Sequence, residues 1–229
     1  MSVAVVTGGS KGLGLALVRG LAGRGWHVVT DARRAGELAA ATNDLPNVTA
    51  IAGDVTDPRH RAALAGAAAA RGGLDLLVNN ASHLGPSPQP ALAAYDLGEL
   101  RRVYEVDVVA PLALVQRVLP LLRASGGTVV NVSSDAAVEP YEGWGGYGSA
   151  KAALDQLTAV LGAEQPDLRA YAFDPGDMRT ELHQLAFPGE DISDRPEPEV
   201  AAAALLRLLD ERPPSGRYRA AAFAPVGAA

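Results

Sequence analysis

The sequence predicts an α/β fold in which helices cover both faces of a parallel sheet of about seven strands. Short apolar runs alternate along the chain with longer stretches in which apolar residues recur at helical spacing. The central apolar runs are continuous, as expected of strands that are buried on both faces. With 229 residues and no internal repeat, we expect one doubly wound, three-layer domain over 1–229.

The first strand and the first helix set the pattern for the rest. Residues 3–6 read Val-Ala-Val-Val, and Leu13, Leu17 and Leu21 then recur every four residues, which is typical of one helix face. By the same reasoning, further strands are expected at 28–30, 48–52, 76–78, 128–132, 169–173 and 217–223. Further helices are expected at 37–42, 59–70, 97–122, 147–165 and 200–211, with an irregularity at Pro111 in the long one.

Residues 187–198 depart from this pattern, because they are rich in proline and acidic residues and have no clear period. We interpret 182–198 as a surface loop on the substrate side, placed after the sixth strand to cover a ligand. The alternative interpretation is a plain connector.

Composition excludes several classes of function. The formal net charge of −6 argues against nonspecific nucleic-acid binding, and the lack of cysteine excludes disulfides and thiolate chemistry. No histidine–carboxylate cluster in the sequence suggests a metal site. The first residues show no signal peptide, and no apolar stretch approaches the roughly 20 residues of a membrane span. We therefore expect a soluble cytoplasmic protein that binds neither nucleic acid nor membrane.

A glycine-rich segment lies between the first strand and the first helix, and reads Thr-Gly-Gly-Ser-Lys-Gly-Leu-Gly over residues 7–14. Glycines allow the backbone to turn sharply and to approach a pyrophosphate closely, and the helix N-terminus offers free N–H groups to the anion. The alternative is an ordinary strand–helix turn, which needs fewer glycines. The nucleotide contacts expected from this segment are Gly8, Ser10, Lys11, Gly12, Leu13 and Gly14.

This Thr-Gly-x-x-x-Gly-x-Gly motif, in this position, resembles the short-chain dehydrogenase/reductase family, whose members have a Rossmann fold. Other motifs of that family follow in the same order over nearly the whole chain, and Ser134, Tyr147 and Lys151 match its Ser…Tyr-x-x-x-Lys motif. Ser82 departs from the family's Asn-Asn-Ala-Gly motif, which has glycine at this position. The resemblance implies further cofactor-binding residues, namely Asp54, Val55, Asn80, Ala81, Ser82, Tyr147, Lys151, Pro175, Gly176, Met178 and Thr180.

The end of the second strand bears on the choice of nicotinamide cofactor. An acidic residue there favours NAD, because it binds the ribose 2′-hydroxyl. By the resemblance, the selecting position is Ala32, and both Arg33 and Lys11 fall where NADP-preferring members have basic residues. Two cations suit a 2′-phosphate, so we expect NADP(H) rather than NAD(H). A shift of one residue would instead make Asp31 an NAD selector.

Tyr147 and Lys151 are four residues apart on one predicted helix, so their side chains share a face. A free phenol has a pKa of about 10, and a neighbouring ammonium lowers it. Ser134 follows the fifth strand, where its hydroxyl can orient a substrate oxygen. Transfer of a hydride to a carbonyl also requires a proton at oxygen, and we predict Tyr147 as the general acid/base. The four-residue spacing of Tyr147 and Lys151 alone would equally suit an ordinary amphipathic helix surface. Ser134 and the upstream motifs favour the catalytic interpretation instead.

Asp107 stands where the family has an asparagine that supports a water in the proton relay to the lysine. An ionised carboxylate accepts hydrogen bonds but cannot donate them. One hypothesis is that Asp107 holds the same water. Another is that its charge pairs with Lys151 and weakens the effect of the lysine on Tyr147, which would alter the pH dependence or remove the reductase chemistry.

Substrate contacts are expected from residues that follow or precede the binding motifs. Aromatic side chains offer a large contact area for an apolar substrate, although loop packing is the alternative explanation for them. The candidates are His83, Tyr141, Trp144 and His183. The resemblance further implies a homodimer or homotetramer, formed through the long helix around Asp107 and the helix that carries Tyr147.

Three functions remain open at this point. The main hypothesis is an NADP(H)-dependent oxidoreductase that acts on a carbonyl or secondary alcohol of a small molecule. The second is a protein of the same fold with non-redox chemistry, such as dehydration or cyclisation, and only Asp107 favours it. The third is a nucleotide-binding protein without turnover, against which Ser134, Tyr147 and Lys151 argue.

Overall fold

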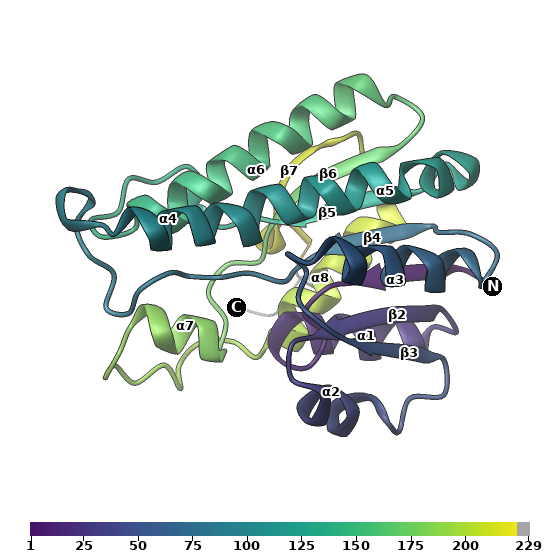
Figure 1. Ribbon diagram of the computed structural model, residues 1–229, viewed down its shortest axis with the longest axis horizontal. Helices are drawn as coiled ribbons and strands as arrows, with labels where there is room; N and C mark the ends of the chain where they lie inside the picture. Colours follow the sequence, from purple (N-terminus) through teal and green to yellow (C-terminus); the bar gives the residue numbers. More distant parts are fainter. Residues whose placement is uncertain (224–229) are drawn as a thin grey trace.

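Seven parallel strands form one sheet in the order β3-β2-β1-β4-β5-β6-β7. The computed structural model describes residues 1–223, and it confirms the predicted doubly wound fold (Figure 1). The strands β1, β4 and β5 in the middle of the sheet are buried throughout. The strand bounds are β1 Val3–Val6, β2 His27–Ala32, β3 Val48–Ala52, β4 Leu76–Asn79, β5 Thr128–Val132, β6 Arg169–Asp174 and β7 Gly216–Arg219.

Helices cover both faces of this sheet. On one face α1 (Gly12–Gly23) packs against α8 (Pro198–Glu211), with α2 (Ala35–Thr42) beside them at the β2–β3 edge. On the other face lie α3 (Pro58–Ala69), α5 (Ala110–Ser125) and α6 (Gly145–Glu164). Figure 1 shows α4 (Leu97–Tyr104), α5 and α6 running along one side of the molecule, with α1 and α2 on the opposite side. The chain thus has the three layers that the alternation of elements predicts.

The apolar stripe of α1 explains the packing on its face of the sheet. Leu13, Leu17 and Leu21 are all buried, and they meet the Ala- and Leu-rich side of α8. Burial of a leucine side chain is worth roughly 1.5–3 kcal/mol relative to exposure. This contact holds the beginning of α1, and with it the glycine-rich segment, against the carboxyl ends of β1 and β2.

The long helix predicted around Pro111 is interrupted just before that proline. α4 (Leu97–Tyr104) passes into a π-helical turn, η2 (Glu105–Val109), and α5 follows. In an α-helix the carbonyl of Asp107 would accept a hydrogen bond from residue 111, but proline has no N–H and its ring presses on that carbonyl. The helix widens here, and the N–H of Ala110 donates to the carbonyl of Glu105. Asp107 lies fully buried within this turn.

Two expectations about the second half of the chain are wrong. Part of the expected loop 182–198 is helical, because α7 (Glu181–Ala186) occupies its first residues. The helix is shorter than two turns, so it leaves no periodic signal, although Thr180 caps it by accepting a hydrogen bond from the His183 N–H. The last strand is shorter than expected, because the last four residues of the expected strand form the 3-10 turn η4 (Ala220–Phe223). Alanine is a poor strand former, and Phe223 turns into the core.

Among the described residues, none of the helices combines the length and the apolar character that crossing a bilayer requires.

Replacement of Leu205 by alanine tests the α1–α8 contact. Leu205 is fully buried in α8, so Leu205→Ala should cost about 2–5 kcal/mol of unfolding free energy. For a chain of this size each kcal/mol lowers the melting temperature by about 2–4 °C. Val200→Ala on the same helix is the control, because Val200 is half exposed and should change the melting temperature little. Equal melting temperatures for the two variants would contradict the packing described.

Candidate active site

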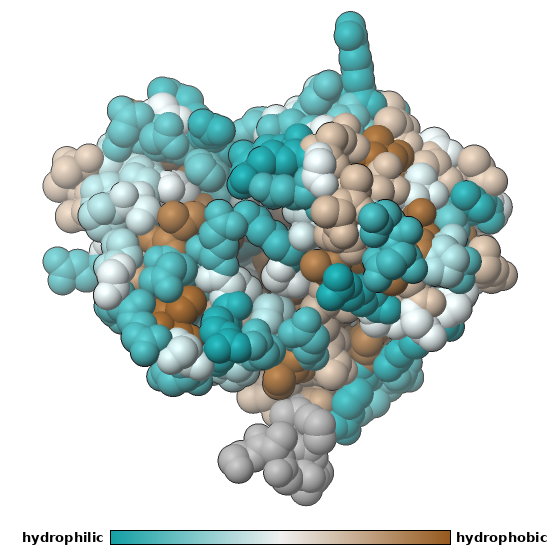
Figure 2. All heavy atoms as spheres, turned by 90° about the horizontal axis from the view of Figure 1, so that it is seen from below, coloured by the Kyte–Doolittle hydropathy of each residue, from teal (hydrophilic) through white to brown (hydrophobic). Residues whose placement is uncertain are grey.

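The carboxyl ends of the strands open into a cavity of about 1110 Å³. It lies where the strand order reverses between β1 and β4, which is where open α/β sheets bind ligands. Figure 2 shows this face hollowed near its centre, between the side of α7 and the side of α1 and α2. The predicted site residues that line the cavity are Gly8, Ser10, Lys11, Gly12, Leu13, Arg33, Asp54, Val55, Asn80, Ala81, Ser82, His83, Ser134, Trp144, Tyr147, Lys151, Pro175, Gly176, Met178, Thr180 and His183.

Three predicted site residues lie outside the cavity wall. Gly14 packs inside the glycine-rich segment, and Asp107 is fully buried behind the wall. Tyr141 is half exposed, and its hydroxyl donates to Asp135 at 3.0 Å rather than facing the cavity. The structure therefore does not place Tyr141 where the sequence analysis expected it, because the loop carries it toward solvent.

The glycine-rich segment depends on two glycines for its shape. Gly8 has φ +73°, a left-handed conformation that residues with a side chain rarely adopt. At Gly14 a Cβ atom would lie 2.2 Å from the carbonyl oxygen of Gly8, so only glycine allows this approach. Lys11 precedes α1 at the N-cap position, and its side chain makes no capping hydrogen bond, which leaves the N–H groups at this end of the helix free for a ligand.

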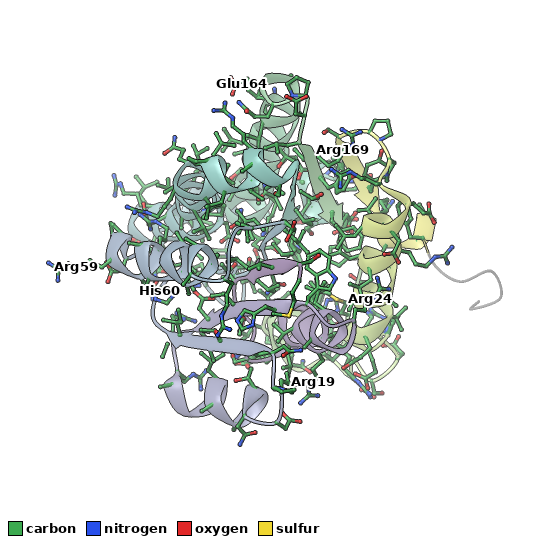
Figure 3. All side chains as sticks on the ribbon, turned by 90° about the vertical axis from the view of Figure 1, so that its right-hand side faces the viewer. Arg19, Arg24, Arg59, His60, Glu164 and Arg169 are labelled. Carbon is green, nitrogen blue, oxygen red and sulfur yellow. The ribbon has the colours of Figure 1, made fainter. Side chains whose placement is uncertain are left out.

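Asp31 holds the glycine-rich segment in place. One of its carboxylate oxygens accepts the N–H of Gly8 at 2.7 Å, and the other lies 2.8 Å from Nε2 of His60. Asp31 and His60 are both buried. In Figure 3 Arg59 extends from α3 into solvent, whereas His60, its neighbour, lies on the side of the helix that faces the sheet. Both oxygens of Asp31 are thus already engaged within the protein.

Basic residues gather at the rim of the cavity near the end of β2. Arg33 lines the cavity and lies close enough to Asp54 to contribute to lowering the pKa of that carboxyl. Burial opposes this shift, and hydrogen bonds from Thr56 are the main cause of the lowered pKa of Asp54. Lys11 pairs with Glu181 at the start of α7, so this ion pair spans the mouth of the cavity.

Tyr147 and Lys151 meet on one face of α6, at the inner end of the cavity. Nζ of Lys151 lies 5.4 Å from the centre of the Tyr147 ring and donates to the carbonyl of Val132 at 2.9 Å. Only 2% of Lys151 is exposed and 6% of Tyr147, so both polar groups are withheld from bulk water. Ser134, at the end of β5, lines the same cavity.

Asp107 contacts Lys151 directly. Its Oδ1 lies 3.1 Å from Nζ of Lys151 and accepts the hydroxyl of Ser82 at 2.5 Å. Its Oδ2 accepts the backbone N–H of His83 at 3.0 Å. The contact that one of the two hypotheses for Asp107 proposes, a pairing with Lys151, is present, and its effect on the chemistry stays a prediction.

Burial and these charges set the protonation of the pair. Burial raises the pKa of Tyr147, Lys151 opposes that rise, and the Asp107 carboxylate adds to it, so the pKa of Tyr147 is raised above its ordinary value. Burial alone would lower the pKa of Lys151, but the nearby Tyr147 and Asp107 outweigh it and the pKa of Lys151 is raised. The expected lowering effect of Lys151 on Tyr147 is therefore present, but burial and Asp107 exceed it.

Ser134 is tied into the structure by its neighbours. Its Oγ donates to Asp135 at 3.1 Å and accepts the N–H of Ala136 at 3.2 Å. Its carbonyl accepts from the guanidinium of Arg217 on β7, at 2.8 Å. The same guanidinium pairs with Asp155 at 2.9 Å and with Asp174 at 3.1 Å. One cation thus joins the ends of β5 and β6 to α6.

Aromatic side chains gather beside Tyr147. Trp144 lies 6.0 Å from the ring of Tyr147 and 5.8 Å from that of Phe187, measured between ring centres. His183 is buried beside Phe187, at 4.8 Å, and its Nε2 has no hydrogen-bond partner. These residues bring α6 and α7 together over the phenol.

Several residues at the cavity carry no sequence pattern that marks them as site residues. Arg101 and Arg102 from α4 line the cavity, but in the sequence they read as an ordinary solvated helix face. Glu181 was missed because its partner Lys11 is far away in the sequence. Asp135 follows Ser134 directly and has no motif to mark it. Within residues 1–223 no group of histidine and carboxylate side chains is arranged to hold a metal ion.

Comparison with known proteins gives consistent matches. The family model described as short chain dehydrogenase matches residues 2–191. The chain is 35% identical to sepiapterin reductase of Mus musculus over 202 residues, which cover 81% of this chain and 77% of that protein. It is 28% identical to benzil reductase ((S)-benzoin forming) of Bacillus subtilis over 237 residues, which cover 95% of this chain and 97% of that protein.

A solved structure with a similar fold contains a nucleotide. The alcohol dehydrogenase from the archaeon Thermococcus sibiricus, complexed with 5-hydroxy-NADP, superposes with a TM-score of 0.86 at 26% identity. The match covers 96% of this chain and 95% of that one.

Replacement of Gly14 by alanine tests the glycine-rich segment. The added methyl group would collide with the Gly8 carbonyl, so Gly14→Ala should weaken the binding of a nicotinamide dinucleotide by about tenfold or more, equivalent to about 1.4 kcal/mol. A fluorescence titration with NADPH measures the dissociation constant. Gly23→Ala, at the far end of α1, is the control, because a methyl group there meets nothing within 4 Å. An unchanged dissociation constant in folded Gly14→Ala protein would contradict this view of the segment.

Proposed function

Because the chain belongs to the short-chain dehydrogenase/reductase family, we propose that it transfers a hydride between NADP(H) and a carbonyl or secondary alcohol carbon of a small molecule. The observation that carries the proposal is the pair Tyr147 and Lys151, buried at the inner end of a cavity whose mouth holds the glycine-rich segment. The names of two relatives, sepiapterin reductase and benzil reductase, agree with carbonyl reduction.

The residues at the mouth of the cavity fit a dinucleotide. A Cβ at Gly14 would collide with the Gly8 carbonyl, so the glycine-rich segment keeps its tight turn only with glycine there, and the free N–H groups of α1 suit a pyrophosphate. Asp54 and Val55 would border the adenine, and Asn80, Ala81 and Ser82 the nicotinamide side. Further along, Pro175, Gly176, Met178 and Thr180 complete the wall. When bound, the nicotinamide supplies or accepts the hydride.

NADP(H) is favoured over NAD(H) by the residues around the end of β2. The carboxylate of Asp31 is already used by Gly8 and His60, so it is a poor partner for a ribose hydroxyl. Arg33 lines the cavity at this point, and Arg suits a phosphate because it binds two oxygens at once. Lys11 supplies a second cation nearby.

Tyr147 acts as the general acid in this proposal. Its raised pKa keeps the phenol protonated at neutral pH, which suits donation of a proton to a carbonyl oxygen. Ser134 positions that oxygen with its hydroxyl, and Lys151 stabilises the phenolate that remains. Trp144 and His183 border the substrate side, and α7 with the following residues up to 198 covers it. We extend the proposal to a cytoplasmic homodimer or homotetramer.

The alternatives are non-redox chemistry in the same fold and nucleotide binding without turnover. Asp107 is the feature that favours the first of them, because it replaces the expected asparagine. The absorbance of NADPH, followed with a panel of ketones and aldehydes that includes sepiapterin and benzil, separates hydride transfer from both alternatives. Binding of NADPH without oxidation by any member of the panel would favour the alternatives.

Replacement of Tyr147 by phenylalanine removes the acidic proton and keeps the ring. Tyr147→Phe should lower kcat by roughly 10²-fold or more, while the dissociation constant for NADPH stays nearly unchanged. Tyr104→Phe is the matched control, because Tyr104 lies on α4 outside the cavity. Full activity of Tyr147→Phe would refute the mechanism.

Replacement of Arg33 by alanine tests the cofactor preference. Arg33→Ala should raise the KM for NADPH by about tenfold or more, equivalent to about 1.4 kcal/mol, and leave the KM for NADH nearly unchanged. Steady-state kinetics with both cofactors measure this difference, and Arg59→Ala, whose side chain extends into solvent, is the control (Figure 3). A wild-type preference for NADH, or equal effects on both cofactors, would overturn the choice of NADP(H).

A further inference from the structure

One guanidinium from the last strand reaches the inner end of the cavity. Arg217 lies on β7, and β6 separates that strand from β5 in the sheet. Its Nη2 nevertheless donates to the carbonyl of Ser134, at the end of β5, at 2.8 Å. The side chain therefore passes across the end of β6, beside α6, which packs against β6 and β7 (Figure 1). The edge strand thus holds the backbone of the residue proposed to orient the substrate.

The same guanidinium binds two carboxylates from two other elements. Its Nε donates to Oδ2 of Asp155 on α6 at 2.9 Å, and its Nη2 donates to Oδ2 of Asp174 on β6 at 3.1 Å. The side chain of Asp174 is 1% exposed and that of Asp155 is 14% exposed, so neither charge is well solvated. Because a guanidinium is planar and rigid, its donors fix the distances between these three acceptors.

Each acceptor belongs to a different part of the cavity wall. Ser134 lines the cavity itself. Oδ1 of Asp174, the oxygen that the guanidinium does not bind, accepts the N–H of Gly176 at 3.0 Å, and Gly176 lines the cavity as well. Asp155 follows Lys151 by about one helical turn on α6. The guanidinium lies behind these groups and joins them without being part of the wall.

We propose that Arg217 is a positioning residue for hydride transfer, because it sets the distance between Ser134 and the cavity wall at Gly176. The inference rests on the proposed carbonyl reduction, in which Ser134 orients the substrate oxygen and Gly176 borders the cofactor. Displacement of a reacting group by about 1 Å can lower a rate by about 10²-fold. A side chain that touches neither reactant can therefore control how fast the hydride moves.

Neutralisation of the two carboxylates is the competing explanation for this guanidinium. Arg219, on the same strand, makes a contact of that kind: its Nε lies 3.3 Å from Oδ2 of Asp174, and its side chain is 64% exposed. Among the described residues, no hydrogen bond joins Arg219 to Ser134 or to Asp155. If charge alone matters, a lysine at position 217 should serve as well as the arginine. If the spacing of the donors matters, it should not.

Arg217→Lys keeps the positive charge but removes the rigid spacing of the donors. A lysine ammonium is a single nitrogen on a flexible stem, so it cannot hold three acceptors at fixed distances. With enzyme in excess over NADPH and a saturating ketone from the panel, the single-turnover rate constant of Arg217→Lys should fall about tenfold or more. The dissociation constant for NADPH should change by less than about threefold, because the contact acts on the reacting geometry rather than on binding.

The single-turnover rate constant also separates positioning from a loss of folded protein. Unfolded molecules lower the amplitude of such a reaction, whereas the rate constant reports only the molecules that react. Arg219→Lys is the matched control, because it makes the same change two residues further along β7. Its rate constant should stay within about twofold of that of the wild type.

Hydrogen exchange tests the bridge without any substrate. The N–H of Ala136 donates to the Ser134 hydroxyl, and the N–H of Gly176 donates to a carboxylate that the guanidinium binds, so the two amides report on both sides of the bridge. In Arg217→Met, which makes none of the three contacts, both amides should exchange about threefold faster or more, as NMR measures, whereas Arg219→Met should leave them unchanged. If Arg217→Met does not fold, Arg217→Lys takes its place in this measurement.

Three results would overturn the inference. One is a single-turnover rate constant of Arg217→Lys within about twofold of the wild type, which would leave charge as the only role of the guanidinium. Another is an equal loss of rate in Arg219→Lys, and the third is unchanged exchange at Ala136 and Gly176. A wild type that oxidises no NADPH would instead overturn the proposed function, while faster exchange at both amides in the Arg217 variant would still support the bridge.

Discussion

The buried contact between Lys151 and Asp107 is the interaction on which the inner end of the cavity depends. Removing two charges from water costs several kcal/mol for each ion, and their attraction offsets this only when the geometry is good and other donors help. Here Ser82, His83 and the Val132 carbonyl complete the pair. Loss of either partner would leave a lone charge in the interior. The pair thus couples α6, η2 and the loop after β4 into one unit.

The sheet and most helices could be predicted because their signals are local. β1 and α1 show an apolar run and a four-residue apolar spacing, and both elements form where those patterns lie. α7 could not be predicted, since six residues give no period. The π turn was only partly predictable: Pro111 marks a disturbed helix, but the sequence does not say that the preceding turn widens to bury Asp107.

Most motif residues of the candidate site were also accessible from sequence, because they follow strands and the carboxyl ends of parallel strands meet at one edge. Tyr147 and Lys151 were accessible because their four-residue spacing places them on one face of α6. What the sequence could not show is which side chains touch. Asp31 illustrates this: in sequence it competes with Arg33 for the cofactor, and only its contacts with Gly8 and His60 show that it is already occupied. Ser82 and Asp107 likewise read as separate substitutions until their contact is seen.

The position of Arg217 near the end of the chain has a consequence for synthesis of the protein. This residue lies on β7, the last strand of the sheet, yet its guanidinium binds the Ser134 carbonyl and the carboxylates of Asp155 and Asp174. While the chain is being synthesised, the polypeptide already contains Ser134, Tyr147 and Lys151 long before Arg217 has left the ribosome. Until it does, two acidic side chains beside the cavity lack their counter-charge. The nascent chain therefore contains Ser134, Tyr147 and Lys151 early, and it gains the cation that joins the ends of β5 and β6 to α6 only near the end of synthesis.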